Sequence, residues 1–158
     1  MNLKNIQQDM RFLISAAITT IIIMTSCGQQ IQEHKVASCI DSFAIYYFNY
    51  DFTNARRFVT DDSEKWLQFA ASNVHESDIE ILKKQDMAKI EITDIEISDN
   101  LTDAEAKIDV KGWLHKTIIG KDPIVEEKTT IKLFAVKDGE QWKVKMVNLP
   151  QSEKQNHD

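Results

Sequence analysis

The spacing of apolar residues changes once along this chain, from a helical period to a period of two, near residue 88. Before that point Val36, Ile40 and Phe43 recur at steps of three and four residues, which places them on one face of a helix. After it, alternate residues from Ala104 to Val110 are apolar and those between them are charged, as in a half-buried strand. Helices followed by a run of strands are typical of an α+β domain.

The helical part divides into shorter segments. Residues 49–51 break the first helical pattern, and an apolar face that begins at Phe52 predicts a second helix. Oxygen-bearing side chains at residues 60–63 are suited to cap a third helix, whose apolar side contains Trp66. A further helical turn is expected near residues 79–83.

The second half of the chain predicts a curved antiparallel sheet of about four strands. Their expected residue ranges are 88–97, 104–114, 124–136 and 142–146. The isoleucines of the first strand change phase near Thr93, which indicates a bulge. Asp138 and Gly139 form a typical hairpin turn before the fourth strand.

The N-terminus has the pattern of a signal peptide. Lys4 and Arg11 precede an apolar run at residues 12–24 that is interrupted by serine and threonine. A helix needs about 20 apolar residues to cross a membrane, so the run is too short for a permanent span.

The sequence MTSCG at residues 24–28 resembles the lipobox of bacterial lipoproteins, in which the cysteine is acylated and becomes the first residue. We therefore expect a signal peptide over residues 1–26 and a lipid on Cys27, which anchors the protein to a membrane. An ordinary secretory peptide and an uncleaved anchor remain alternatives. Asp after the lipobox cysteine resembles an inner-membrane retention signal, and Gly28 stands there instead. This favours the outer membrane facing the periplasm, with surface display as the alternative.

For the rest of the chain the sequence predicts a polar tether at residues 27–34, one α+β domain at residues 35–150 and a polar tail at residues 151–158. The net charge of −6 argues against nucleic-acid binding. If Cys27 is acylated, Cys39 has no cysteine partner, and its position on the apolar helical face predicts a buried thiol.

Two segments carry a resemblance to a known superfamily. YDFTNARRFVT at residues 50–60 and DGEQWKV at residues 138–144 are similar to the nuclear transport factor 2-like (cystatin-like) superfamily, in particular its small lipoprotein domains. The resemblance spans roughly residues 35–150 and implies N-terminal helices packed on a curved antiparallel sheet. It implies no single activity, because this superfamily contains isomerases, dehydratases and binding modules.

The enzymes of this superfamily that resemble steroid isomerases place acid and base groups between helices and sheet. The inward rows of the predicted sheet contain no ionisable side chain: they are Ala104, Ala106, Ile108, Val110, Leu114, Ile131, Leu133, Ala135, Trp142, Val144 and Met146. His75 and His115 are expected at the surface, with a pocket rim as the alternative. No histidine pair has metal-ligand spacing and no glycine-rich turn opens a helix. We therefore predict no catalytic, cofactor-binding or metal site.

Apolar residues on the outward phase of the sheet suggest an interface. The predicted patch consists of Trp113, Phe134, Val136, Val147 and Leu149. It favours a non-catalytic binding or assembly module that contacts a protein partner or a second copy. Two alternatives stay open, a small-ligand-binding domain that uses the cavity between helices and sheet, and a weakly catalytic domain. The patch would be lost if the sheet curls or if residues 118–119 and the tail cover it.

Overall fold

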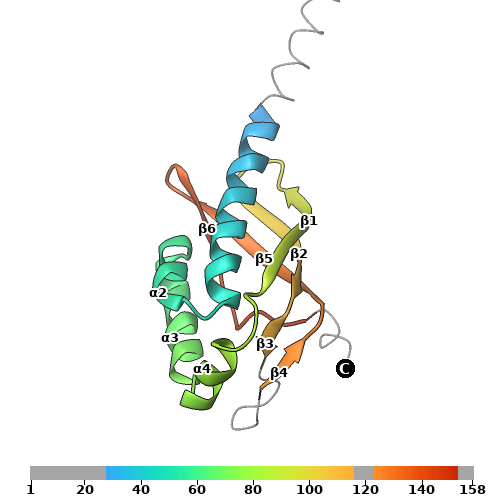
Figure 1. Cartoon of the computed structure of the whole chain (residues 1–158). Coiled ribbons are helices and arrows are strands. Elements are labelled where there is room, and N and C mark those ends of the chain that lie inside the picture. Colours follow the sequence, from blue (N-terminus) through green and yellow to red (C-terminus); the bar gives the residue numbers. More distant parts are fainter. Residues whose placement is uncertain (1–27, 116–122, 153–158) are drawn as a thin grey trace, which may run out of the picture. The chain divides into compact units, whose positions relative to one another are not determined.

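The computed structural model of the chain describes residues 28–115 and 123–152. Within the compact unit Lys35–Asp158, helices precede strands and pack on one face of a four-stranded antiparallel sheet (Figure 1). The α+β class and the four-stranded sheet are as predicted. The predicted signal peptide, residues 1–26, and the predicted lipid site Cys27 lie outside the described residues.

The N-terminal helix covers residues 28–48 of the described chain. The segment 28–34, which we predicted to be a polar tether, is helical, and its role as a tether stays a prediction. The helical segments that follow are α2 (Phe52–Ala55), η1 (Arg56–Phe58), η2 (Asp61–Ser63), α3 (Glu64–Ser72) and α4 (Glu76–Leu82).

Caps and turns set the ends of these helices. Tyr50 has a φ of 66°, in the left-handed region, and the Asp51 amide donates to the Tyr46 carbonyl at 2.9 Å, which ends the N-terminal helix. Asp51 then caps α2, because its Oδ1 accepts from the amide of Asn54 at 3.1 Å. The predicted break at residues 49–51 is confirmed.

The main sheet has the strand order β1-β2-β5-β6. Its strands are β1 (Lys89–Ile97), β2 (Asp103–Lys111), β5 (Thr129–Asp138) and β6 (Gln141–Val144). The register between β1 and β2 shifts between Ile92 and Asp94, and the Thr93 hydroxyl donates to the carbonyl of Lys107 at 3.1 Å. The predicted bulge is therefore confirmed.

Two predicted strands are divided in the structure. β2 ends at Lys111, and β3 (Trp113–His115) pairs with β4 (Ile124–Glu126) in a separate two-stranded sheet. The break falls at Gly112, whose φ of 74° lies in the left-handed region and turns the strand out of the ladder.

The last hairpin and the start of the tail are both held by the sheet. Asp138 pairs with Gln141 across a turn in which Gly139 has a φ of 61°, as the sequence predicted. Ser152, which we expected in a polar tail, is instead buried and forms a bridge with Ile131 of β5.

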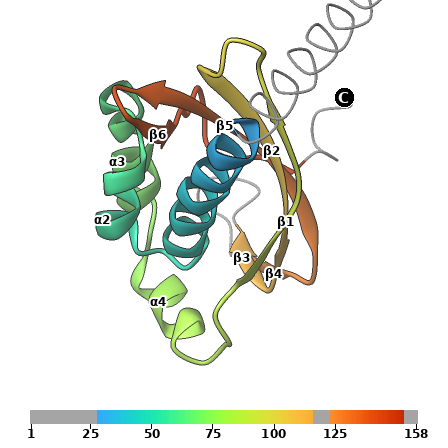
Figure 2. The same ribbon diagram turned by 90° about the horizontal axis from the view of Figure 1, so that it is seen from above.

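The core lies between the sheet and the helices. Figure 2 shows the N-terminal helix between the curved sheet on one side and α2 and α3 on the other. The inward rows predicted from the sequence are buried, and Trp142 is 5% exposed. The Cys39 thiol donates to the Trp142 carbonyl at 3.1 Å, and burial raises the pKa of this thiol to about 11.

Candidate functional site

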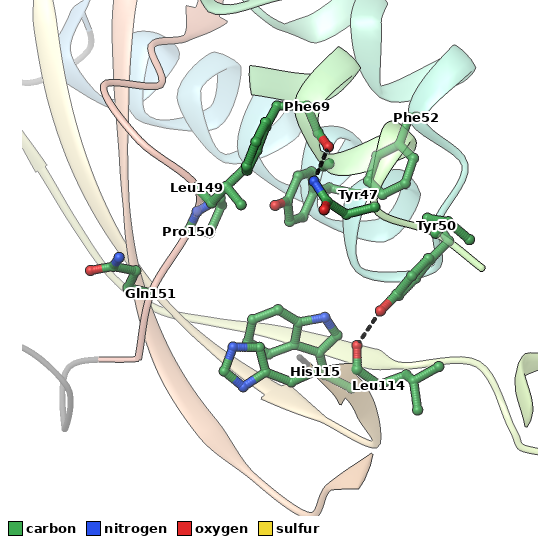
Figure 3. A pocket seen from close by; sticks show the side chains of 13 residues that line it. Tyr47, Tyr50, Phe52, Phe69, Leu114, His115, Leu149, Pro150 and Gln151 are labelled. Carbon is green, nitrogen blue, oxygen red and sulfur yellow. Dashed lines mark hydrogen bonds between the residues drawn. The ribbon is translucent and has the colours of Figure 1, made fainter. Parts of the chain in front are cut away.

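A pocket opens where the end of the N-terminal helix and helix α3 meet the small sheet (Figure 3). Its volume is about 230 Å³. The lining side chains are mostly aromatic or aliphatic and come from five parts of the chain: Tyr47, Tyr50, Phe52, Phe69, Ala70, Asn73, Val74, Trp113, Leu114, His115, Leu149, Pro150 and Gln151. None of these described lining residues is Asp, Glu, Lys or Arg.

One hydrogen bond fixes the helix end against the small sheet. The Tyr50 hydroxyl donates to the carbonyl oxygen of Leu114 at 2.6 Å. Burial, and second the charge of Asp78, raise the pKa of Tyr50 to about 12, so its hydroxyl keeps its proton at neutral pH. The Tyr50 side chain therefore holds the end of the N-terminal helix against β3 at the pocket wall.

Trp113 and His115 form the floor of the pocket. Their rings stack with centroids 4.2 Å apart and planes at 24°, and Phe48 meets Trp113 edge-on at 5.0 Å. The turn at Gly112 produces this arrangement, because both Trp113 and Leu114 are buried immediately after it. Strict alternation would have turned one of them to solvent.

His115 is a neutral imidazole in this setting. Burial lowers the pKa of His115, and the nearby Glu126 carboxylate offsets part of that effect. Its Nδ1 lies 3.9 Å from Glu126 Oε1. The sequence favoured the surface for His115, and that prediction was wrong: its side chain is only 12% exposed and lines the pocket.

Tyr47 supplies a hydroxyl without a partner. The residue is 6% exposed, and among the described residues no hydrogen bond is made by its hydroxyl. Its ring is held by Phe43, Phe48 and Phe52, at centroid distances of 5.3, 5.1 and 5.5 Å. Burial raises the pKa of Tyr47 well above its usual value, so the hydroxyl remains a hydrogen-bond donor.

A buried carboxyl group lies behind the pocket. Asp78 of α4 is fully buried, and its Oδ2 accepts from the His75 amide at 2.8 Å. Sequence reasoning missed Asp78, because it looked for buried carboxylates only on the strands. The sequence did carry a signal. An acidic side chain three residues after the N-cap of a helix often accepts a hydrogen bond from the amide of that N-cap residue.

The predicted apolar patch is not continuous. Trp113 is 6% exposed, so its assignment to the outer face was wrong, and Leu149 is half-buried and lines the pocket. Phe134 and Val147 are exposed, at 45% and 67%, and Val136 is half-buried. The patch residues thus fall into two groups: Trp113 and Leu149 line the pocket, whereas Phe134 and Val147 line a separate hollow.

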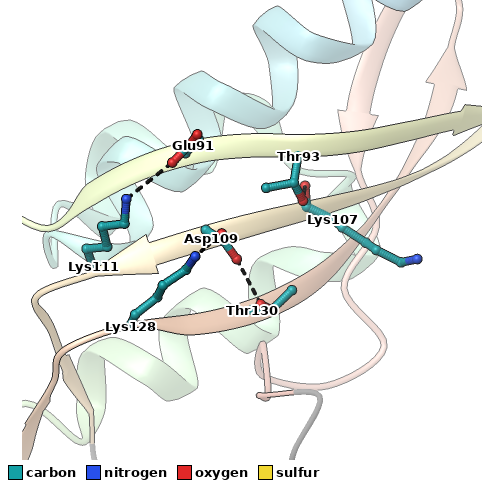
Figure 4. A network of polar contacts seen from close by, with 7 residues as sticks. All are labelled: Glu91, Thr93, Lys107, Asp109, Lys111, Lys128 and Thr130. Carbon is teal, nitrogen blue, oxygen red and sulfur yellow. Dashed lines mark hydrogen bonds and ion pairs between the residues drawn. The ribbon is translucent and has the colours of Figure 1, made fainter.

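The outer face of the sheet is instead dominated by paired charges (Figure 4). Lys111 contacts Glu91 at 3.3 Å, and Lys128 contacts Asp109 at 2.7 Å. The Thr130 hydroxyl donates to the same Asp109 carboxylate at 2.8 Å. The Lys111–Glu91 pair is exposed, as is typical of a solvated face, whereas Asp109 is largely covered by its partners.

Phe134 is surrounded by charge on this outer face. It pairs across the strands with Glu105, which contacts Lys132 at 2.7 Å, and its carbonyl accepts from the amide of Lys145 at 2.8 Å. Phe134 and the exposed Val147 nevertheless line one shallow hollow of the surface, so an interface at this part of the predicted patch stays a prediction.

Comparison with protein-family models, with curated proteins and with solved structures finds no match for this chain. Within residues 28–115 and 123–152, no three His, Cys, Asp or Glu side chains are grouped so that they could hold a metal ion. No helix in that same part of the chain is long and apolar enough to span a membrane.

Proposed function

We propose that the protein is an envelope lipoprotein whose domain binds a small molecule, without catalysis, in the pocket between the helices and the small sheet. One observation carries this proposal: an aromatic pocket of about 230 Å³ is lined by Tyr47, whose hydroxyl makes no hydrogen bond to a described residue and is open to the pocket. Concave, mostly apolar sites with a few directed polar groups are the usual form of small-molecule sites.

The ionisable groups that line the pocket favour binding over catalysis. Because the pKa of Tyr47 and that of Tyr50 are raised, both hydroxyls stay protonated at neutral pH and neither is available as a phenolate base. His115 is neutral, but its ring is stacked on Trp113 and its Nδ1 faces Glu126. The pocket therefore presents donors and flat apolar surfaces more than a matched pair of acid and base.

The arrangement of the domain supports membership of the nuclear transport factor 2-like superfamily. The N-terminal helices cover the inner face of a curved antiparallel sheet, and the pocket lies between them. The similar segments at residues 50–60 and 138–144 become helix α2 with η1 and the last hairpin. Superfamily membership adds no ligand identity to the proposal.

Membrane anchoring is proposed from the N-terminal sequence alone. The apolar run at residues 12–24 and the lipobox-like residues 24–28 support a lipid on Cys27, and Gly28 supports the outer membrane facing the periplasm. Cys27→Ser should abolish labelling by a radioactive fatty acid and release the protein from the detergent phase. Retention of the Cys27→Ser variant in membranes would instead indicate that residues 12–24 are an uncleaved anchor.

A fragment screen tests the pocket directly. Protein-observed NMR of the full-length protein in detergent, with a library of small ring compounds, should give hits whose shifts cluster at Tyr47, Trp113 and His115. Ala70→Phe fills the pocket and should abolish these hits. Ala71→Phe is the matched control, because Ala71 is the next residue of α3 and lies outside this pocket. Hits that survive Ala70→Phe, or a screen without pocket hits, would refute the proposed site.

A further inference from the structure

The geometry points to the ligand class of this pocket: an uncharged compound with a single ring and an oxygen that accepts a hydrogen bond from Tyr47. The inference rests on the proposed function, because it assumes that the pocket is the binding site. Three features carry it, namely the free hydroxyl, the absence of charge in the described lining and the size of the cavity.

The Tyr47 hydroxyl is the directing polar group. It makes no hydrogen bond to a described residue and is not among the buried polar atoms that lack a partner, so it is open to the pocket and can donate to a bound molecule there. Tyr47 lies on the pocket wall across from His115 (Figure 3). Three phenylalanine rings hold the Tyr47 ring, so its hydroxyl cannot turn toward another acceptor without disturbing the core. An acceptor oxygen on a bound molecule would complete the bonding of this group.

The lining selects against charged ligands. No described lining residue carries a formal charge at neutral pH, since His115 is held neutral by burial. A carboxylate ligand would find no cation among the described lining residues, and the buried Asp78 carboxyl close to Tyr50 makes the region less favourable for an anion. An ammonium ligand would find no carboxylate among those lining residues, because Glu126 lies beside His115 and does not itself line the pocket. Moving an unpaired charge out of water into such a site is strongly unfavourable.

The size and surface of the pocket select for one flat ring. Sites for drug-sized ligands begin at about 300 Å³, and this cavity is smaller, at about 230 Å³. Its floor is the stacked pair of Trp113 and His115, whose planes differ by only 24°. Flat aromatic surfaces bind flat rings by offset or edge-on contact.

Four probes of nearly equal size separate these requirements. Acetophenone is uncharged with an acceptor oxygen, ethylbenzene lacks the oxygen, benzoate is an anion and benzylammonium is a cation. Titration into the full-length protein in detergent, followed by ligand-detected NMR, gives an affinity for each. We expect acetophenone to bind about three- to tenfold more tightly than ethylbenzene, the range for one hydrogen bond, and the two ions to bind more weakly than both.

Two tyrosine variants assign the difference to one hydroxyl. Tyr47→Phe should bring the affinity for acetophenone down to that for ethylbenzene, and its unchanged affinity for ethylbenzene reports that the pocket is intact. Tyr46→Phe is the matched control. Tyr46 is the preceding residue of the same helix, does not line the pocket and stacks on Phe58, so its variant should retain the preference for acetophenone.

Several outcomes would overturn the inference. Equal binding of acetophenone and ethylbenzene, tighter binding of either ion, an unaltered preference in Tyr47→Phe, or no binding of acetophenone would each do so. The proposed function fails if the fragment screen finds no ligand in the pocket or if its hits survive Ala70→Phe. A pocket that binds other fragments and ignores acetophenone would therefore retain the function and refute this ligand class.

Discussion

The two faces of the main sheet are built from the same strands and differ in almost every physical respect. Inward residues of β2 such as Ala106 and Ile108 are at most 1% exposed and contact the helices. Outward residues of the same strand, such as Glu105 and Lys107, pair with charges on neighbouring strands. The inner face thus stabilises the fold by burying apolar side chains, whereas the outer face presents charged side chains to solvent. The largest expected effects of substitution lie on the inner face.

Trp142→Ala should be the most damaging of the single changes considered. Trp142 is 5% exposed, and its carbonyl accepts from the buried thiol of Cys39. Truncation of a buried tryptophan typically lowers the free energy of unfolding by about 3 to 5 kcal/mol. Urea denaturation followed by circular dichroism measures this loss. A loss below about 1 kcal/mol would show that the core does not depend on this inward row.

Trp113 of the small sheet and Phe134 on the outer face of the main sheet compare a buried with an exposed aromatic side chain. Trp113 is buried against Phe48, so Trp113→Ala should lower the free energy of unfolding by about 3 kcal/mol, the lower end for a site that borders a cavity. Phe134 is 45% exposed, and Phe134→Ala should change the free energy of unfolding by no more than about 0.5 kcal/mol. Paired urea titrations give both values. Similar losses in the two variants would contradict this difference in burial.

Asp109→Asn tests the charged face through its pH dependence. The hydrogen bond from Lys128, followed by that from Thr130, lowers the pKa of Asp109 below its usual value. A carboxyl with a lowered folded-state pKa stabilises the fold above its unfolded pKa of about 4, and this contribution is lost as the pH falls through the folded pKa. The variant should lower Tm by no more than about 4 °C at neutral pH. The difference should vanish in acid, and a constant difference would exclude the ion pair as its cause.

His115→Gln should have the smallest effect, confined to mildly acidic solution. Because burial lowers the pKa of His115, the unfolded chain binds a proton more readily than the folded one. The wild type should therefore lose stability as the pH falls below about 6.5, and His115→Gln should lose less. Thermal melts across this range measure the two slopes, with His75→Gln at an exposed position as the control. If Tm depends on pH with the same slope in the wild type and in His115→Gln, the His115 imidazole is exposed to solvent.

Much of the fold could be predicted because local spacing and local chemistry agree. The inward rows, the bulge at Thr93 and the turn at Gly139 are each specified by neighbouring residues and are confirmed. The pocket could not be predicted in this way. It forms because Gly112 takes a left-handed conformation, which directs Trp113 and His115 toward a helix that is remote in sequence. Alternation along a strand carries no information about where the strand leaves its ladder.

The reactivity of the buried Cys39 thiol can report how often the domain opens. Thiol reagents attack the thiolate, and Cys39 is buried with a pKa raised to about 11, so the folded domain offers almost no reactive sulfur. The unfolded chain exposes the same atom with an ordinary pKa of about 8.5. In a Cys27→Ser background, which leaves Cys39 as the remaining cysteine of the chain, the rate of alkylation therefore follows the population of opened molecules. Any compound that binds the folded domain should slow that rate in proportion to its occupancy.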